Sequence, residues 1–114
     1  MKDLIGKKIL KAFKGEDVVY FETDDGDYRL YHEQYCFEQV EIVDIDNDLS
    51  LLNGGIVLNA EHIRDKDKEP LYEDDESYSW NFYKIFTDKA SVTITAYGTS
   101  SGYYSEELTL ERMR

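Results

Sequence analysis

The chain has 114 residues, of which 41% are hydrophobic and 14% aromatic, and its 25 acidic and 13 basic residues give a formal net charge of −12 at pH 7. This length and apolar content predict one folded domain over residues 1–114 and exclude a disordered chain. The charge argues against direct binding to nucleic acid, because that affinity comes from Lys and Arg side chains that neutralise phosphates. We expect no membrane span or secretory signal, and the single cysteine, Cys36, fits a reducing cytoplasm.

Strand-forming residues begin early in the chain. Residues 18–23 and 28–32 are rich in β-branched and aromatic side chains, and residues 24–27 between them contain Asp-Gly, a strong hairpin signal. In the second arm, His32 shares a face with Leu30, because side chains alternate along a strand. These residues therefore predict an antiparallel hairpin.

The segment of residues 44–55 begins like a calcium-binding loop, with Asp at its first, third and fifth positions. It lacks the glycine at position 6 and the glutamate at position 12 that an EF-hand requires. We instead expect Asp48 or Asn47 to cap a short helical turn over residues 49–52, which Asn53 and Gly54 end. No metal site and no cofactor are predicted.

Further segments have the composition of strands. They are residues 40–43, 55–60, 79–86, 91–97 and 103–110, and residues 7–13 are expected to form either another strand or a short helix. Residues 79–86 are largely apolar on both faces, as in a central strand covered on two sides, and residues 91–97 place Val92, Ile94 and Ala96 on the core side. Pro70 and the acidic run around it predict a long exposed loop over residues 64–77.

These elements predict a mainly β protein, or an α+β protein with one short helix. The expected architecture is an antiparallel sheet, a small sandwich or a barrel.

His32 and Cys36 are the only soft-metal ligands that lie close together in the sequence. A zinc site needs further ligands, and the other histidine, His62, lies on an unrelated segment. On a strand, residues four apart lie roughly 13 Å from each other, so a direct catalytic pair would need a turn between them. We therefore interpret Cys36 as a small buried hydrophobe and His32 as a satisfied, partly buried polar residue, and we predict no catalytic residue and no enzyme.

Residues 98–102 are small and are followed by two tyrosines. Such a loop either lets a ligand or a partner backbone approach closely, or forms a simple hairpin turn.

Two motifs carry a resemblance to a known family: Tyr31-His32-Glu33-Gln34-Tyr35-Cys36 and Gly98-Thr99-Ser100-Ser101-Gly102-Tyr103-Tyr104-Ser105. They resemble segments of small proteins encoded by tailed bacteriophages and prophages, which are known only as a domain of unknown function. The resemblance extends over nearly the whole chain. The family usually has two adjacent cysteines preceded by an aspartate in the first motif, whereas Phe37 and Tyr35 occupy two of these places here. This difference argues against a dithiol or metal role, and the resemblance implies a phage origin and a location in the cytoplasm of the infected or lysogenic host.

Acidic residues concentrate in residues 15–48 and 61–76. This charge serves either solubility alone or the binding of a basic partner. We predict a protein that binds a host protein and occupies its basic nucleic-acid-binding surface, as anti-CRISPR and anti-restriction inhibitors do. The residues expected to bind the partner are Asp24, Asp25, Asp27, Asp74, Asp75 and Glu76.

The alternative hypothesis is a small-molecule or enzymatic pocket formed where residues 32–38 meet residues 98–105. Its expected lining is His32, Gln34, Cys36, Glu38, Tyr97, Ser100, Tyr103 and Tyr104. A phage structural or accessory protein without catalytic activity, which oligomerises through its tyrosine-rich surface, stays open as a third hypothesis.

Overall fold

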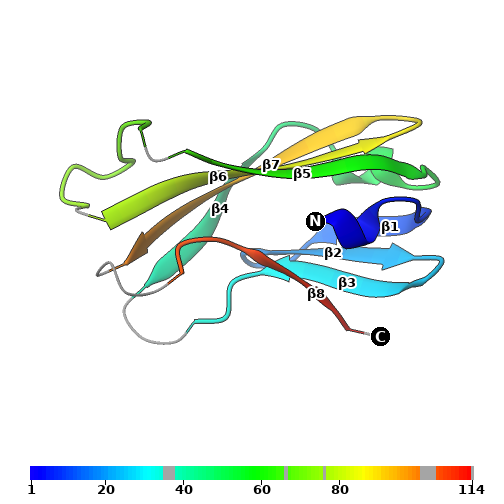
Figure 1. Ribbon diagram of the computed structural model, residues 1–114, viewed down its shortest axis with the longest axis horizontal. Coiled ribbons are helices and arrows are strands. Elements are labelled where there is room, and N and C mark those ends of the chain that lie inside the picture. Colours follow the sequence, from blue (N-terminus) through cyan, green and yellow to red (C-terminus); the bar gives the residue numbers. More distant parts are fainter. Residues whose placement is uncertain (35–37, 66, 76, 101–104, 114) are drawn as a thin grey trace.

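Two antiparallel sheets of four strands each pack against one another (Figure 1). The structure is a computed structural model, and it describes residues 1–34, 38–65, 67–75, 77–100 and 105–113. The first sheet has the strand order β1-β2-β3-β8, and the second has the order β4-β7-β6-β5. The strands are β1 (Ile9–Lys14), β2 (Val18–Thr23), β3 (Gly26–Tyr31), β4 (Gln39–Ile45), β5 (Val57–Asp65), β6 (Ser77–Thr87), β7 (Ser91–Ser100) and β8 (Thr109–Arg112). The predicted mainly β, antiparallel architecture is confirmed, and it is a sandwich.

The helical content of the described residues is limited to two 3-10 turns, η1 (Lys2–Leu4) and η2 (Leu49–Leu52). Residues 7–13, which the sequence left open between strand and helix, belong mainly to β1. The described residues contain no helix that is long and apolar enough to cross a membrane.

The core lies between the inner faces of the two sheets. Phe21 and Leu30 from the first sheet are fully buried, as are Ile94 and Ala96 from the second. Alternation along each strand sends these side chains inward, and hydrophobic burial of such residues drives the two sheets together. The expected core side of residues 91–97 is therefore confirmed.

Two local predictions are also confirmed. The β2–β3 hairpin closes at the Thr23–Gly26 pair, where Gly26 has a φ of 105° and the Thr23 hydroxyl donates to the Gly26 carbonyl at 2.6 Å. In η2, the Asp48 side chain accepts a hydrogen bond from the Ser50 backbone N–H at 2.9 Å. Asp48 thus caps the turn, as helix-start chemistry predicts.

The C-terminal strand prediction is wrong in part. β8 begins only at Thr109, and residues 105–108, which we call the crossing segment, run from the second sheet to the first without strand structure (Figure 1). Residues 101–104 lie outside the described residues. The predicted loop over residues 98–102 is also wrong at its start, because β7 continues to Ser100 and includes Gly98.

Side chains of β6 explain why the crossing segment is not a strand. The Leu108 N–H donates to the Tyr83 hydroxyl at 2.6 Å, and the same hydroxyl donates to the Leu108 carbonyl at 3.1 Å. The Asn81 amide donates to the Glu106 carbonyl at 3.2 Å. Backbone groups that a strand would pair with another strand are satisfied here by buried side chains instead.

Gly98 allows the crossing segment to lie directly on β7. A Cβ atom added at Gly98 would lie 2.0 Å from the Glu106 carbonyl oxygen, which is backbone and cannot move aside as a flexible side chain can. The absence of a side chain at this position is therefore a condition of the close packing.

We expect Gly98→Ala to destabilise the fold by at least about 3 kcal/mol, because overpacking against backbone forces the crossing segment away from β7. Gly6→Ala is the matched control, since Gly6 has a φ of 86° but nothing within 4 Å of an added Cβ. This control variant should lose only about 1–2 kcal/mol of stability, because alanine is strained in the left-handed backbone conformation of Gly6. Urea unfolding measures both changes, and equal losses of stability would contradict the packing argument.

Candidate functional site

A β-bulge in the edge strand β4 determines which of its side chains face outward. Pairing with β7 shifts between Ile42 and Asp44, so that Val43 is an extra residue. Ile42 and Ile45 both lie opposite core residues of β7, whereas Asp44, like Glu41, lies opposite a residue of the outer face. The bulge thus turns Asp44 outward and still returns Ile45 to the core side.

Asp46 continues this row of carboxylates. Its backbone N–H donates to the Thr93 carbonyl at 3.1 Å, and its side chain accepts from the Thr93 N–H at 2.7 Å. Asp44 and Asp46 are exposed, and Glu41 is half-buried. Residues two apart on a strand are roughly 7 Å from one another, so this edge presents closely spaced negative charge.

Residues 67–75 form a loop that folds onto the outer face of the second sheet. The Trp80 indole N–H donates to the Glu69 carbonyl at 2.9 Å, and the Tyr97 hydroxyl donates to Asp75 Oδ2 at 2.6 Å. Lys68 Nζ lies 4.2 Å from the centre of the Trp80 ring. The predicted exposed loop is therefore anchored at several points, and it covers the outer side of β6 and β7.

The loop also meets the edge strand. The Tyr72 hydroxyl donates to Glu41 Oε1 at 3.3 Å, and the negative charge of Glu41 raises the pKa of Tyr72. This contact brings the loop carboxylates beside those of β4. We call the resulting surface the acidic face, and it consists of Glu41, Asp44, Asp46, Glu73, Asp74 and Asp75.

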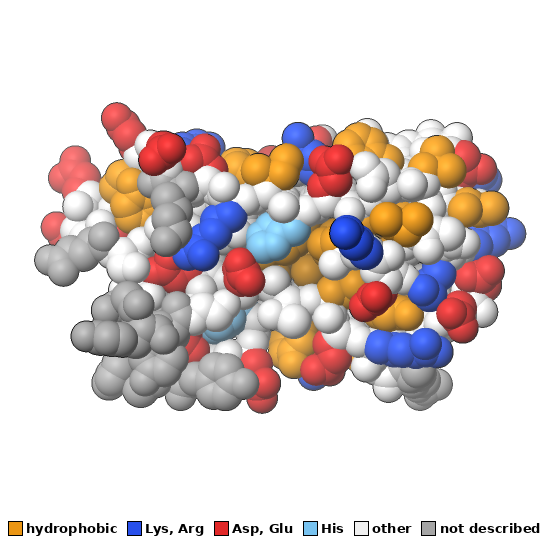
Figure 2. Space-filling view, viewed as in Figure 1, with side chains coloured by type: hydrophobic (Ala, Val, Ile, Leu, Met, Phe, Trp, Pro, Cys, Tyr) orange, Lys and Arg blue, Asp and Glu red, His pale blue; other side chains and the backbone are white. Residues whose placement is uncertain are grey.

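The other predicted acidic group lies at the opposite end of the molecule, at the β2–β3 turn (Figure 1). Asp25 lies 4.0 Å from Lys7 Nζ and 3.8 Å from an Arg112 guanidinium nitrogen, and Asp24 accepts from the Lys8 N–H at 3.0 Å. Figure 2 shows acidic and basic side chains interspersed at this end. The hairpin acids, Asp24, Asp25 and Asp27, thus belong to a mixed-charge surface, and Glu76 lies outside the described residues.

A buried carboxylate organises the polar interior. Glu106 is 4% exposed, and its Oε2 accepts from the Ser77 and Ser100 hydroxyls, both at 2.7 Å. Its Oε1 lies 3.4 Å from an Arg64 guanidinium nitrogen. The charge of Glu106 is thus compensated inside the fold, as a buried carboxylate requires.

The structure brings together part of the predicted pocket. His32 Nε2 lies 3.2 Å from Glu38 Oε1, His32 Nδ1 lies 3.2 Å from the Glu107 carbonyl oxygen, and the Gln34 amide donates to the Glu38 carbonyl. The His32 side chain is 7% exposed and satisfied, as the sequence indicated. Cys36 lies outside the described residues.

Two other predicted pocket residues, Tyr97 and Ser100, face opposite sides of β7. Tyr97 faces outward under the loop, where its ring centre lies 4.8 Å from that of Trp80, whereas Ser100 points inward to Glu106. Successive side chains of a strand alternate between faces, so Tyr97 and Ser100 do not line one cavity. Tyr103 and Tyr104 lie outside the described residues.

The interior polar groups hold the crossing segment in place. In the described residues, every buried side-chain nitrogen or oxygen has a hydrogen-bond partner. The same residues contain no group of three or more His, Cys, Asp or Glu side chains that could hold a metal ion. Because these polar atoms are directed at one another, the arrangement stabilises the fold and leaves the acidic face as the candidate functional site.

Sequence reasoning identified Asp74 and Asp75 but did not single out Glu41 and Asp44 of β4, or Asp46, which directly follows β4. The bulge at Val43 is the reason, because strict alternation would send Asp44 to the core side together with Ile42.

Tyr97 supplies a pH-dependent test of the loop anchor. Burial, together with the hydrogen bond to Asp75, raises the pKa of Tyr97 to about 12. Since the tyrosine pKa in an unfolded chain is about 10, the protonated hydroxyl contributes stability that is complete below this value and lost as the pH rises towards 12.

We expect Tyr97→Phe to cost about 1 kcal/mol near neutral pH and to increase amide exchange in the loop. Urea unfolding at about pH 8 and about pH 11 should show a smaller alkaline loss of stability in the variant than in the wild type. Tyr83, whose pKa burial also raises, is present in both proteins and cancels from the difference. An identical alkaline loss in both proteins would contradict the anchor.

Comparison with known proteins identifies the chain only at the level of a family. The sequence matches no curated protein and no solved structure. The family model described as "Domain of unknown function (DUF7448)" matches residues 2–110, and so extends from η1 into β8. The chain therefore belongs to the DUF7448 family.

Proposed function

We propose that this protein binds a host protein through the acidic face and occupies a basic surface that otherwise holds nucleic acid. A single observation carries the proposal. In the described part of the chain, none of the six residues of the acidic face has a Lys, Arg or His nitrogen within 4.0 Å, whereas Asp25 at the hairpin has two such neighbours. The acidic face thus carries closely spaced charge that is left for a partner.

The geometry of the acidic face suits a groove lined by Lys and Arg. Carboxylates spaced along β4 and continued by the loop present a row of negative charge comparable to a nucleic-acid backbone. The loop is fixed by Trp80, Tyr97 and Glu41, so the charges of Asp74 and Asp75 are held in place before binding. Preorganisation of this kind reduces the entropy lost on association.

The resemblance to phage and prophage proteins supports a counter-defence role. A protein made during infection gains from inhibiting host enzymes that cleave or bind nucleic acid, and such enzymes carry basic grooves. In this proposal the protein is an inhibitor without catalytic activity, located in the bacterial cytoplasm.

The test begins with capture of partners from a lysate of a bacterial host on the tagged protein, with elution by rising salt. We expect a basic nucleic-acid-binding protein that high salt releases, because attraction between exposed charges is screened. A triple variant, Asp44→Asn with Glu73→Gln and Asp74→Asn, should weaken its binding to the purified partner by about tenfold or more. The triple variant should also restore binding of the partner to an oligonucleotide.

The matched control removes the same number of charges at the hairpin, with Asp24→Asn, Asp25→Asn and Asp27→Asn. We expect this variant to bind the partner within about twofold of the wild type, because these charges lie at the opposite end of the molecule, where Lys7 and Arg112 lie beside Asp25. If the two triple variants lose the same affinity for the partner, only net charge matters, and the acidic face is rejected as the site. If neither triple variant nor high salt weakens binding to the partner, the electrostatic mechanism is rejected altogether.

A further inference from the structure

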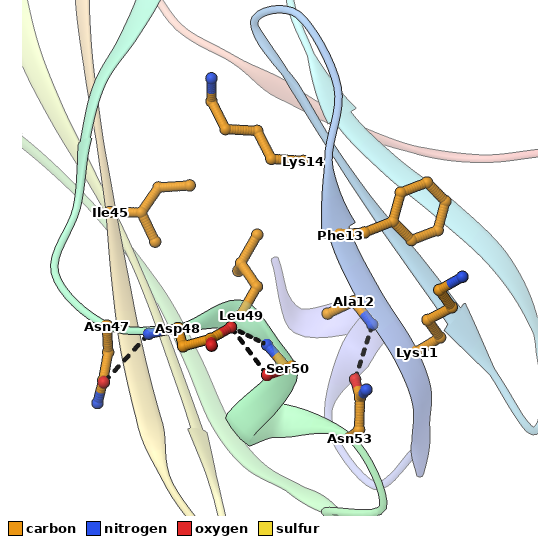
Figure 3. A pocket seen from close by; sticks show the side chains of 10 residues that line it. All are labelled: Lys11, Ala12, Phe13, Lys14, Ile45, Asn47, Asp48, Leu49, Ser50 and Asn53. Carbon is orange, nitrogen blue, oxygen red and sulfur yellow. Dashed lines mark hydrogen bonds between the residues drawn. The ribbon is translucent and has the colours of Figure 1, made fainter.

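A cavity of about 460 Å³ lies between β1 of the first sheet and the β4–η2 region of the second (Figure 3). Ala12 and Leu49, which are 4% and 8% exposed, form its apolar floor with the half-buried Ile45. The volume falls in the range of small-molecule sites, roughly 300–1,000 Å³. The cavity is separate from the acidic face, which lies on the outer side of the second sheet.

Lys14 is an unusual residue for its position in the sandwich. It pairs with Val19, whose side chain is fully buried in the core, so alternation directs Lys14 towards the space between the sheets. Figure 3 shows its side chain extending into the gap above Ile45 and Leu49, whereas the side chain of Lys11 points away. Lys14 is exposed, so its aliphatic stem borders the apolar floor and its ammonium group lies at the rim of the cavity.

The charge of Lys14 has no counterpart within the described residues. No carboxylate oxygen in this part of the chain lies within 4.0 Å of its Nζ atom. The acidic residue that lines the cavity, Asp48, accepts hydrogen bonds from the Ser50 N–H and hydroxyl at 2.9 and 2.8 Å, and these bonds lower the pKa of Asp48. Asp44 lines a neighbouring hollow together with Lys14, but neither carboxylate forms an ion pair with the ammonium.

We propose that this cavity binds a small amphipathic anion, with its acidic head on Lys14 Nζ and its apolar body against Ala12, Ile45 and Leu49. A compound with one sulfonate or carboxylate group and an aromatic or short aliphatic body has this chemistry. The apolar surface supplies affinity, and the ammonium group selects for the charge and fixes the orientation. The inference does not depend on the function proposed for the acidic face.

The probe is 8-anilino-1-naphthalenesulfonate, whose fluorescence rises in an apolar site, compared with N-phenyl-1-naphthylamine, which lacks the sulfonate. We expect saturable binding of the sulfonate to the folded protein and a loss of roughly fivefold in affinity in Lys14→Met, which keeps most of the aliphatic stem. The uncharged probe should bind both proteins equally. Lys14→Arg should retain sulfonate binding, which separates loss of charge from loss of folding.

Lys11→Met is the matched control, because Lys11 lies on the same strand but points out of the cavity. It should leave the affinity for both probes unchanged. Amide shifts in a heteronuclear NMR titration locate the bound sulfonate, and we expect the largest changes at Ala12, Lys14, Ile45 and Leu49. Sulfonate binding that is equal in Lys14→Met and the wild type, or shifts confined to other elements, would overturn the proposal.

Discussion

The reciprocal hydrogen bonding between the Tyr83 hydroxyl and the backbone of Leu108 is the contact on which the rest of the structure depends. It joins the centre of the second sheet to the chain that leads into β8, which pairs with β3 of the first sheet. Burial raises the pKa of Tyr83, so the group stays a neutral hydroxyl that can both donate and accept. Gly98 has no side chain to block the crossing segment, and the charge of Glu106 is compensated by Arg64 and two serines. The crossing segment therefore packs against the second sheet, and every buried side-chain polar atom of the described residues has a hydrogen-bond partner.

The outer face of the second sheet combines protection and recognition. An edge strand exposes unpaired backbone groups, and charged side chains with a bulge are common means of preventing its association with other strands. In β4, the bulge at Val43 and the exposed Asp44 serve this purpose, and the Asp17 carboxylate also accepts from the Ile42 N–H at 3.1 Å. The carboxylates of Glu41, Asp44 and Asp46, extended by the anchored loop, form the acidic face. A surface that keeps the edge soluble is thus also suited to a basic partner.

The two proposed sites have opposite charge and different neighbours. The acidic face depends on Tyr72, Tyr97 and Trp80 holding the loop against β6 and β7. The cavity depends on the separation of β1 from β4 and η2, with Lys14 between them. Because the acidic face and the lining of the cavity share no residue, partner binding and anion binding can be tested separately.

The sequence by itself determined the features that depend on a few adjacent residues. It indicated the hairpin that closes at Gly26, the turn capped by Asp48, and the inward positions of Ile94 and Ala96, because turn chemistry, capping and alternation act locally. Only the tertiary structure decided that residues 105–108 leave the strand pattern. It also decided that Asp44 turns outward, that Tyr97 and Ser100 face opposite sides of β7, and that Lys7 and Arg112 lie beside Asp25. These outcomes depend on contacts between residues far apart in the chain, which local propensity does not contain.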